Sequence, residues 1–192
     1  MSWRSGHIED NELIGRARNG DVAAYEDLVR RYQDVALRTA HLVCPEADAD
    51  DAVQDAFLKA YAALPRFRDG APLRPWLLRI VANEARNRRR SSGRRVGLAL
   101  RVADVESTVG PPTAPNPEAE VMAAESRREL LAALSTLRDD DREILGARFL
   151  LDLSEAEAAE TLGLARGTVK SRTSRALGRL REALATAGVT ER

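Results

Sequence analysis

Apolar residues recur at spacings of three and four along most of this chain, which is the pattern of amphipathic helices. Alternation with a period of two, which would indicate strands, is nearly absent. In the first half, the pattern predicts helices over residues 9–19, 22–43, 48–64 and 76–90. In the second half, it predicts helices over residues 118–137, 139–151 and 155–162, and a last helix that begins near residue 167 or 168. We therefore expect an all-α protein.

Interruptions in the pattern give the expected ends of the first helices. Asp21 is placed to cap the second helix, and Cys44-Pro45 ends it because proline cannot continue the backbone hydrogen-bond ladder. Residues 1–8 are expected to be a loose tail, and residues 65–75 a loop.

The longest interruption covers residues 91–117, where the helical pattern is lost and prolines cluster near the end. Such composition is typical of a linker. We therefore expect two small helical domains, residues 9–90 and 118–187, joined by a flexible linker.

The stretch from residue 153 to 184 predicts a helix-turn-helix in the C-terminal domain. Ser154 is a good N-cap, and Glu157 completes a capping box. Gly163 ends the first helix because glycine tolerates a left-handed backbone. In this layout, the second helix enters the major groove of DNA near its N-terminal end.

The outer face of the second helix is basic and rich in hydroxyl groups. It carries Arg166, Lys170, Ser171, Arg172, Ser174 and Arg175. An ordinary solvated basic face would look similar, but acidic residues crowd the preceding helix while the second has only Glu182 near its end. This asymmetry favours DNA contact through phosphates and base edges.

Composition limits how the protein can bind nucleic acid and where it acts in the cell. The 192 residues carry 30 basic and 30 acidic side chains, so nucleic-acid binding must rest on local segregation of charge. The single cysteine, Cys44, excludes an intramolecular disulfide, and no hydrophobic signal segment opens the chain. No apolar run approaches the roughly 20 residues that span a bilayer. These features indicate the cytoplasm.

The sequence gives little support for a catalytic or metal site. The spacing of His41, Cys44 and Asp48 does not match a zinc signature, so we expect a buried or half-buried structural cysteine. Asp50 and Asp51 suit the positive end of a helix dipole. With two histidines, one cysteine and no phosphate loop, we expect no metal, no cofactor and no enzymatic activity.

A second basic region begins in the 65–75 loop. There Phe67 is interleaved with arginines, a combination that can stack on and neutralise single-stranded nucleic acid. The following helix opens at Trp76 and ends in the run Arg88, Arg89 and Arg90. The alternative is again a solvated face, but a run this basic on a packed helix favours tracking of a nucleic-acid backbone.

Four blocks of sequence, in this order, resemble the extracytoplasmic-function (ECF) group of bacterial sigma factors, the small two-domain kind. The blocks are AYEDLVRRYQDVALRTA, DADDAVQDAFLKAYAALPRFR, PWLLRIVANEARNRRR and the C-terminal LRDDDREILGARFLLDLSEAEAAETLGLARGTVKSRTSRALGRLR. The resemblance implies a protein that is not an enzyme, that joins core RNA polymerase at the clamp helices of its largest subunit, and that directs it to promoter DNA. An anti-sigma factor is the implied regulator, and no small-molecule substrate is implied.

The resemblance also implies roles for particular residues. Polymerase docking would fall to Asp51, Gln54, Asp55 and Lys59. The melted −10 element would meet Phe67, Arg68, Trp76, Arg79, Asn83, Arg86 and Arg88, with Asn83 as the best candidate for base contact. The −35 element would be read by the basic face of the last helix, with Arg166 and Arg172 on phosphates.

Two departures from the family pattern leave sequence preference open. Pro72 and Pro75 stiffen the loop before Trp76, so the captured base is not specified. Ser174 stands where some relatives have a larger side chain. The alternative function is a free-standing DNA-binding regulator, which would leave the second basic segment from Trp76 to Arg90 without a use. A purely structural adaptor would leave the basic face unexplained.

Overall fold

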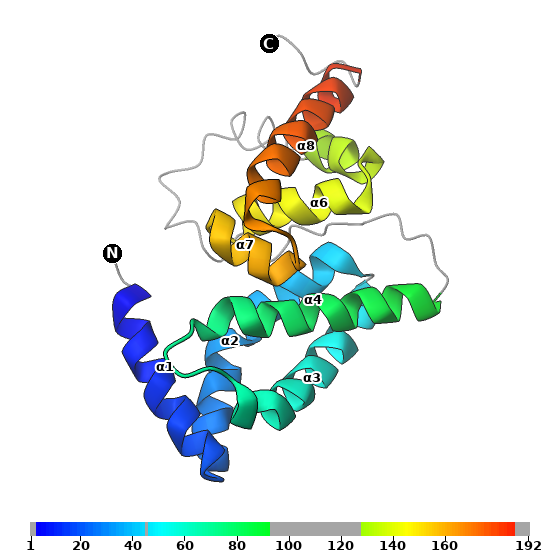
Figure 1. Cartoon of the computed structure of the whole chain (residues 1–192). Helices are drawn as coiled ribbons and strands as arrows, with labels where there is room; N and C mark the ends of the chain where they lie inside the picture. The colour runs from blue at the N-terminus through cyan, green and yellow to red at the C-terminus, as the bar shows by residue number, and fades with distance from the viewer. Residues whose placement is uncertain (1–2, 45, 93–127, 187–192) are drawn as a thin grey trace, which may run out of the picture.

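The computed structural model describes residues 3–44, 46–92 and 128–186, and the described residues contain helices and no strands. This confirms the all-α prediction. The elements are α1 (Trp3–Arg18), α2 (Val22–Val43), α3 (Glu46–Ala63), η1 (Leu64–Arg66), α4 (Leu73–Ser92), α6 (Asp139–Leu145), η3 (Gly146–Leu150), α7 (Glu155–Leu162) and α8 (Arg166–Thr186) (Figure 1). Residues 128–136 are also helical. The predicted linker lies outside the described residues, except for its first two positions.

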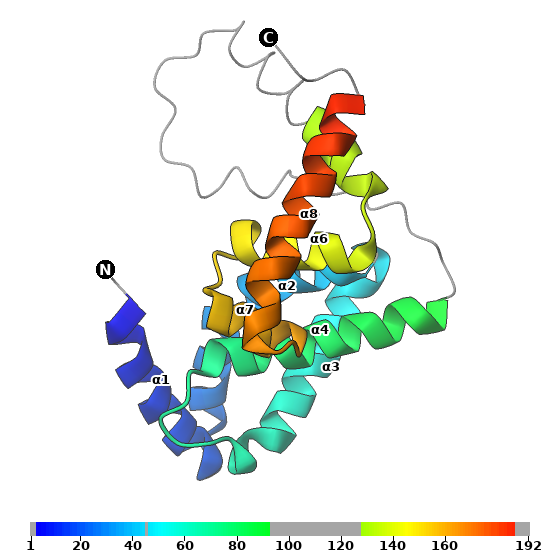
Figure 2. The same ribbon diagram turned by 45° about the horizontal axis from the view of Figure 1, so that its top comes forward.

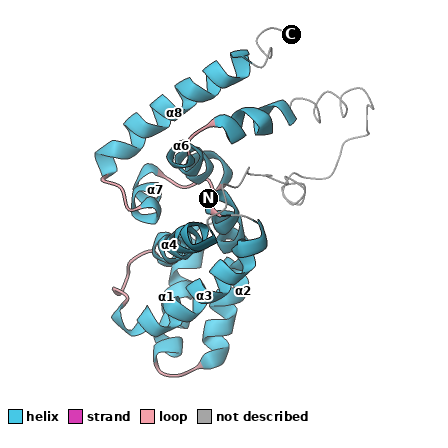
Figure 3. Cartoon of the chain, turned by 90° about the vertical axis from the view of Figure 1, so that its right-hand side faces the viewer, coloured by secondary structure: helices cyan, strands magenta, loops and turns pink. Residues whose placement is uncertain are grey.

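The N-terminal unit is built from α1 to α4. Helices α2, α3 and α4 pack against one another, and α1 lies along α2 (Figures 1 and 3). A small apolar cluster under α1 unites Ile14, Leu28, Leu64 and Phe67. This cluster joins α1 to the segment that connects α3 with α4.

The C-terminal unit is built from α6, η3, α7 and α8, with α8 packed on both α6 and α7 (Figure 2). Val169 and Ala176 of α8 are fully buried. Arg179 of α8 donates to both carboxylate oxygens of the buried Asp141, at 2.7 and 2.8 Å. This ion pair fixes α8 against α6.

The two units share one apolar core. Helix α7 lies on α4, and residues of both units belong to the same buried cluster (Figures 1 and 3). Leu42 of α2 sits so close to Gly146 that a Cβ there would lie 2.5 Å from Leu42 Cδ2. The side chain of Arg74 donates to the carbonyl of Leu151 at 2.7 Å. The α4–α7 contact therefore places the second basic region beside the C-terminal unit.

Helices α1 and α4 begin three or more residues earlier than the sequence predicted. Helix α1 starts at Trp3, within the stretch expected to be a tail. Helix α4 starts at Leu73, so Pro75 lies in its first turn rather than in the loop. Proline is tolerated there because the first N–H groups of a helix have no intrahelical acceptor. Pro75 is also fully buried.

The helix predicted over residues 139–151 changes character halfway. Helix α6 ends at Leu145, and a π-helical turn, η3, follows. The wider turn changes the direction of its side chains, and Phe149 and Leu150 are 60% and 48% exposed. Among the described residues, no helix combines the length and apolar character needed to cross a membrane.

Candidate nucleic-acid interface

The helix-turn-helix forms as predicted from its cap and its glycine. Glu157 N–H donates to Ser154 Oγ at 3.2 Å, and Ser154 N–H donates to Glu157 Oε2 at 2.9 Å, which completes the capping box. Gly163 has φ of 69°, the left-handed conformation that glycine adopts without strain. Helix α8 then begins at Arg166. The turn holds α7 and α8 in the layout of a DNA-binding motif.

One face of α8 is fully accessible. We call it the recognition face, and its exposed residues are Lys170, Ser171, Ser174 and Arg175. Within the described residues neither Lys170 nor Arg175 forms an ion pair, and the Nε of Arg175 donates to the carbonyl of Ser171 on the same helix at 3.2 Å. Two cations and two hydroxyl groups are thus presented together, which suits contact with phosphates and base edges.

The other predicted cation of this helix with a described side chain is Arg172, which lies 3.6 Å from Asp140 of α6. The Asp140 side chain is 75% exposed, so this ion pair contributes little to stability and exchanges readily for a phosphate.

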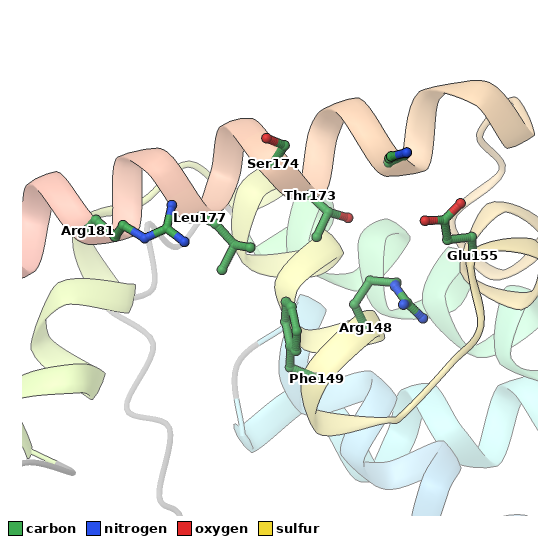
Figure 4. A pocket seen from close by; sticks show the side chains of 8 residues that line it. Arg148, Phe149, Glu155, Thr173, Ser174, Leu177 and Arg181 are labelled. Atoms are coloured by element: carbon green, nitrogen blue, oxygen red, sulfur yellow. The ribbon is translucent and has the colours of Figure 1, made fainter.

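A shallow groove of about 240 Å³ separates α8 from η3. Thr173 and Leu177 of α8 point across it toward Phe149, while Ser174 points away toward solvent (Figure 4). Arg148 lies at the same side of the groove as Glu155 (Figure 4). Lys170 and Ser174 of the recognition face also line this partly apolar groove, so the two surfaces share residues of one helix.

Helix α4 carries the second candidate surface. Arg79, Asn83 and Arg86 follow one another at spacings of four and three and lie on one face. Arg79 and Asn83 are exposed. Arg86 Nη1 donates to Asn83 Oδ1 at 3.2 Å, which leaves the amide nitrogen of Asn83 free to donate to a ligand.

Arg88 does not belong to this face. It points to α3, where its guanidinium donates to Asp51 at 2.8 Å and to Asp55 at 2.6 Å. Hydrogen bonding to Asp55 and the nearby carboxylates raise the pKa of Arg88 further above its ordinary value. The structure thus pairs a predicted DNA-binding residue with two predicted polymerase-docking residues.

The aromatic pair at the start of α4 is part of the core. Phe67 is 6% exposed, and its ring centroid lies 4.8 Å from that of the half-buried Trp76. Neither ring is presented as an open stacking platform. In this geometry the pair supports the 67–72 loop from within, whereas Arg68 is exposed at its surface.

The outer face of α3 carries the predicted docking residues. Asp51 and Gln54 are exposed, and Asp55 is half-buried beside Arg88. Lys59 pairs with Glu84 of α4, whose carboxylate is largely buried. Leu58, which the sequence did not single out, is 65% exposed on this helix. A single exposed leucine is common on protein surfaces, so Leu58 alone does not identify a docking surface.

Glu143 of α6 pairs with two arginines of α4 and was not predicted. Arg86 donates to Glu143 Oε2 at 2.7 Å, and Arg89 Nη1 lies 3.5 Å from Oε1. Glu143 is 6% exposed, so its charge requires these partners. In sequence it stands beside Ile144 in a helical stripe, where an isolated acidic residue gives no signal of its role.

Cys44 fulfils the expectation of a buried thiol, being 2% exposed at the end of α2. Burial raises its pKa to about 11, and the nearby Asp48 adds to the effect. Within the described ranges, no group of three or more His, Cys, Asp or Glu side chains is placed to hold a metal.

Comparisons with known proteins place this chain in a family. The family model for Sigma-70 region 2 matches residues 28–95, and that for Sigma-70, region 4 matches residues 127–180. The ECF RNA polymerase sigma-E factor of Escherichia coli (strain K12) is 34% identical over 176 residues, which are 90% of this chain and 92% of that protein. The RNA polymerase sigma factor NccH of Alcaligenes xylosoxydans xylosoxydans is 36% identical over 172 residues, covering 89% and 92%. The chain therefore belongs to the ECF group of RNA polymerase sigma factors, which confirms the resemblance.

Two solved structures are similar to the fold. CnrH, in complex with the cytosolic domain of CnrY, matches with a TM-score of 0.64 and 29% identity, over 93% of this chain and 98% of that chain. The sigma factor RpoE from Bartonella quintana, in complex with the anti-sigma factor NepR, matches with a TM-score of 0.57 and 31% identity, over 83% and 98%.

Proposed function

We propose that this protein binds core RNA polymerase and directs it to promoters, reading the −35 element as duplex and the −10 element as melted non-template strand. The observation that carries this proposal is the recognition face of α8, which lies in the Sigma-70, region 4 match. The basic helix α4 lies in the Sigma-70 region 2 match. Residues 9–90 would act on the −10 element, and residues 118–187 on the −35 element. The protein would act as an initiation factor rather than as an enzyme.

The −35 reading rests on the chemistry of the recognition face. Lys170 and Arg175 donate to guanine edges or phosphates, and the hydroxyl groups of Ser171 and Ser174 donate or accept. Arg172 reaches a phosphate by leaving Asp140, and Arg166 opens the helix at the end where backbone N–H groups favour anions.

The −10 reading rests on α4 and the 67–72 loop. Asn83 offers a free amide beside Arg79, and both are exposed. Arg86 contacts a phosphate only after its ion pair with Glu143 has broken, and Arg88 only after it has left Asp51 and Asp55. Phe67 and Trp76 would hold the loop, with Arg68 facing the strand. Capture of extruded bases offsets an unstacking cost of a few kcal/mol.

Partners follow from the exposed face of α3 and from the family. Asp51, Gln54, Asp55 and Lys59 would dock on the clamp helices of the largest polymerase subunit, with Leu58 as an apolar contact. Because the similar structure of the sigma factor RpoE is a complex with the anti-sigma factor NepR, and CnrH is bound to the cytosolic domain of CnrY, we propose an anti-sigma factor as a further partner.

The test separates docking, duplex reading and melting. Asp55→Arg should weaken binding to core polymerase, whereas Asp34→Arg, at an exposed position of α2, should not. Asn83→Ala should lower the yield of open complex more than initial recruitment, with Gln33→Ala as the matched amide control. Arg175→Ala should lose roughly 1–3 kcal/mol of discrimination among mutated −35 sequences. Unchanged polymerase affinity, open-complex yield and −35 preference in the three variants would contradict the proposal.

A further inference from the structure

The loop between α3 and α4 is held by a side chain from a different helix. Arg18, at the last turn of α1, reaches across to this loop, which passes beside α1 (Figure 1). Its Nε donates to the carbonyl of Leu64 at 3.0 Å, its Nη2 to the carbonyl of Phe67, and its Nη1 to a carboxylate oxygen of Asp69. One guanidinium therefore binds three positions of the loop.

The geometry of these three contacts is specific to arginine. The guanidinium carries five N–H donors in a rigid planar fork, so contacts to Nε and to both terminal nitrogens fix the acceptors relative to one another. The Arg18 side chain is 21% exposed, and two of its acceptors are backbone carbonyls. Lysine presents one ammonium group and cannot hold the same three acceptors in place.

The rest of the loop is shaped around this contact. On the inner side, Phe67 packs against Trp76 of α4. At the tip, Gly70 has φ of 71°, and the N–H of Ala71 donates to the carbonyl of Arg68 at 3.2 Å. The Asp69 side chain, 88% exposed, stands at the surface with Arg18 behind it. Arg18 thus supports the exposed tip from the side opposite to solvent.

Helix α1 is held in place by contacts with α2 and with the apolar cluster, so the backbone that carries Arg18 is fixed. Asp10 of α1 is 3% exposed and accepts from Arg31 at 2.6 Å and from the hydroxyl of Tyr32, both on α2. Ile14 and Ala17 pack into the apolar cluster beneath the loop. The Sigma-70 region 2 match begins at residue 28, so α1 lies outside it, whereas the residues of α2 and of the loop that α1 contacts lie inside it.

We propose that Arg18 is a positioning residue for promoter melting: it holds the 67–72 loop in the shape that receives an unstacked base of the −10 strand. This inference rests on the proposed function. Arg18 does not touch the DNA; it fixes the main chain at Phe67 and the carboxylate of Asp69, on either side of the exposed Arg68. Loss of this contact leaves a loop that samples several shapes and selects poorly among bases.

The experiment measures base preference rather than activity alone. Open-complex yield is determined with core polymerase on two panels of one promoter, varied at single positions in the −10 or the −35 element. In Arg18→Gln, the ratio between preferred and disfavoured −10 bases should fall toward one, by about tenfold, because hydrogen bonds to a charged group are lost. Preference across the −35 panel should stay unchanged. Arg18→Lys should not restore the −10 preference.

Two controls make the outcomes distinguishable. Arg16→Gln removes a neighbouring arginine that pairs with Asp21 instead of the loop, and it should leave both panels unchanged. Asn83→Ala reports on the proposed −10 surface itself. If Asn83→Ala alters the −10 panel and Arg18→Gln does not, the positioning role is refuted while the proposed function stands. If neither variant alters it, the −10 function fails and the inference with it.

A purely structural role would give a different pattern. If Arg18→Gln lowers the thermal unfolding midpoint and reduces yield on all promoters by the same factor, with base preferences intact, the side chain only stabilises the fold and the proposal is overturned. A changed −10 profile with an unchanged −35 profile, at a temperature where circular dichroism shows the variant fully folded, supports it.

Discussion

Cys44 shows how burial decides the chemistry of a single residue. The thiol lies at the end of α2, 2% exposed, and burial with the nearby Asp48 raises its pKa to about 11. At neutral pH it is therefore protonated and a poor nucleophile. The sequence predicted a buried or half-buried structural cysteine because the spacing of His41, Cys44 and Asp48 matches no zinc signature, and the structure confirms the burial.

The raised pKa of Cys44 predicts how stability changes with pH. Below its ordinary value of 9.0 the thiol is protonated in both the folded and the unfolded chain. Above that value the unfolded chain releases the proton, while the folded chain keeps it until about pH 11, so the free energy of unfolding falls over this window. Urea unfolding between pH 8 and 11 should show a steeper decline in the wild-type protein than in Cys44→Ala. Parallel curves would show that the thiol titrates normally.

Helix α7 shows how far an element can be predicted from local sequence. Its bounds, its capping box and its C-terminal glycine were all predicted, because each signal lies within four residues of the helix end. Helix α2 was predicted for the same reason, from Asp21 and from its apolar spacing. The predicted start of α1 was wrong because the first eight residues carry no capping residue and no clear stripe of apolar side chains.

The capping box gives an element-scale prediction. Ser154→Ala removes the acceptor for the Glu157 N–H and should lower the free energy of unfolding by about 1 kcal/mol. Urea denaturation followed by circular dichroism measures the change. Ser135→Ala is the matched control, because its hydroxyl donates to the carbonyl of Ala132 within the preceding turn and caps no helix. Equal effects of the two substitutions would contradict the role of the cap.

The candidate site was only partly predictable from sequence. Exposure of Lys170, Ser171 and Arg175 follows from helical spacing, and the structure confirms it. The pairing of Arg88 with α3 and of Arg86 with Glu143 joins positions far apart in the chain, and periodicity holds no information about such contacts. Roles assigned to these residues from the family remain predictions.

At the scale of the whole molecule, the two helical units pack through close apolar contact as well as ion pairs. Gly146 meets Leu42 across the interface, where a Cβ would lie 2.5 Å from Cδ2 and 2.7 Å from Cδ1. Leu42 is buried, so it has little room to move. Arg86 and Arg89 meet Glu143 at the same interface. The promoter contact proposed for Arg86 would therefore compete with its ion pair to Glu143 in the packing of the units.

The Gly146–Leu42 contact predicts non-additive stabilities. Gly146→Ala should lower the free energy of unfolding by about 1–3 kcal/mol through overpacking, although alanine favours a helix. Combining it with Leu42→Ala should cost less than the two single changes together, because the smaller side chain makes room for the new methyl group. Gly178→Ala, where a Cβ meets nothing within 4 Å, is the control and should stabilise slightly. Strict additivity in urea unfolding would contradict this packing.

Run-off transcription tests the central claim most directly. Core bacterial RNA polymerase is incubated with fragmented DNA from the protein's own genome, with and without the protein. We predict new, discrete transcripts whose aligned upstream sequences contain both a −35 and a −10 element, and their loss on mutation of either element. No new transcripts, together with no binding of the protein to core polymerase, would contradict sigma-factor function and favour a free-standing DNA-binding regulator.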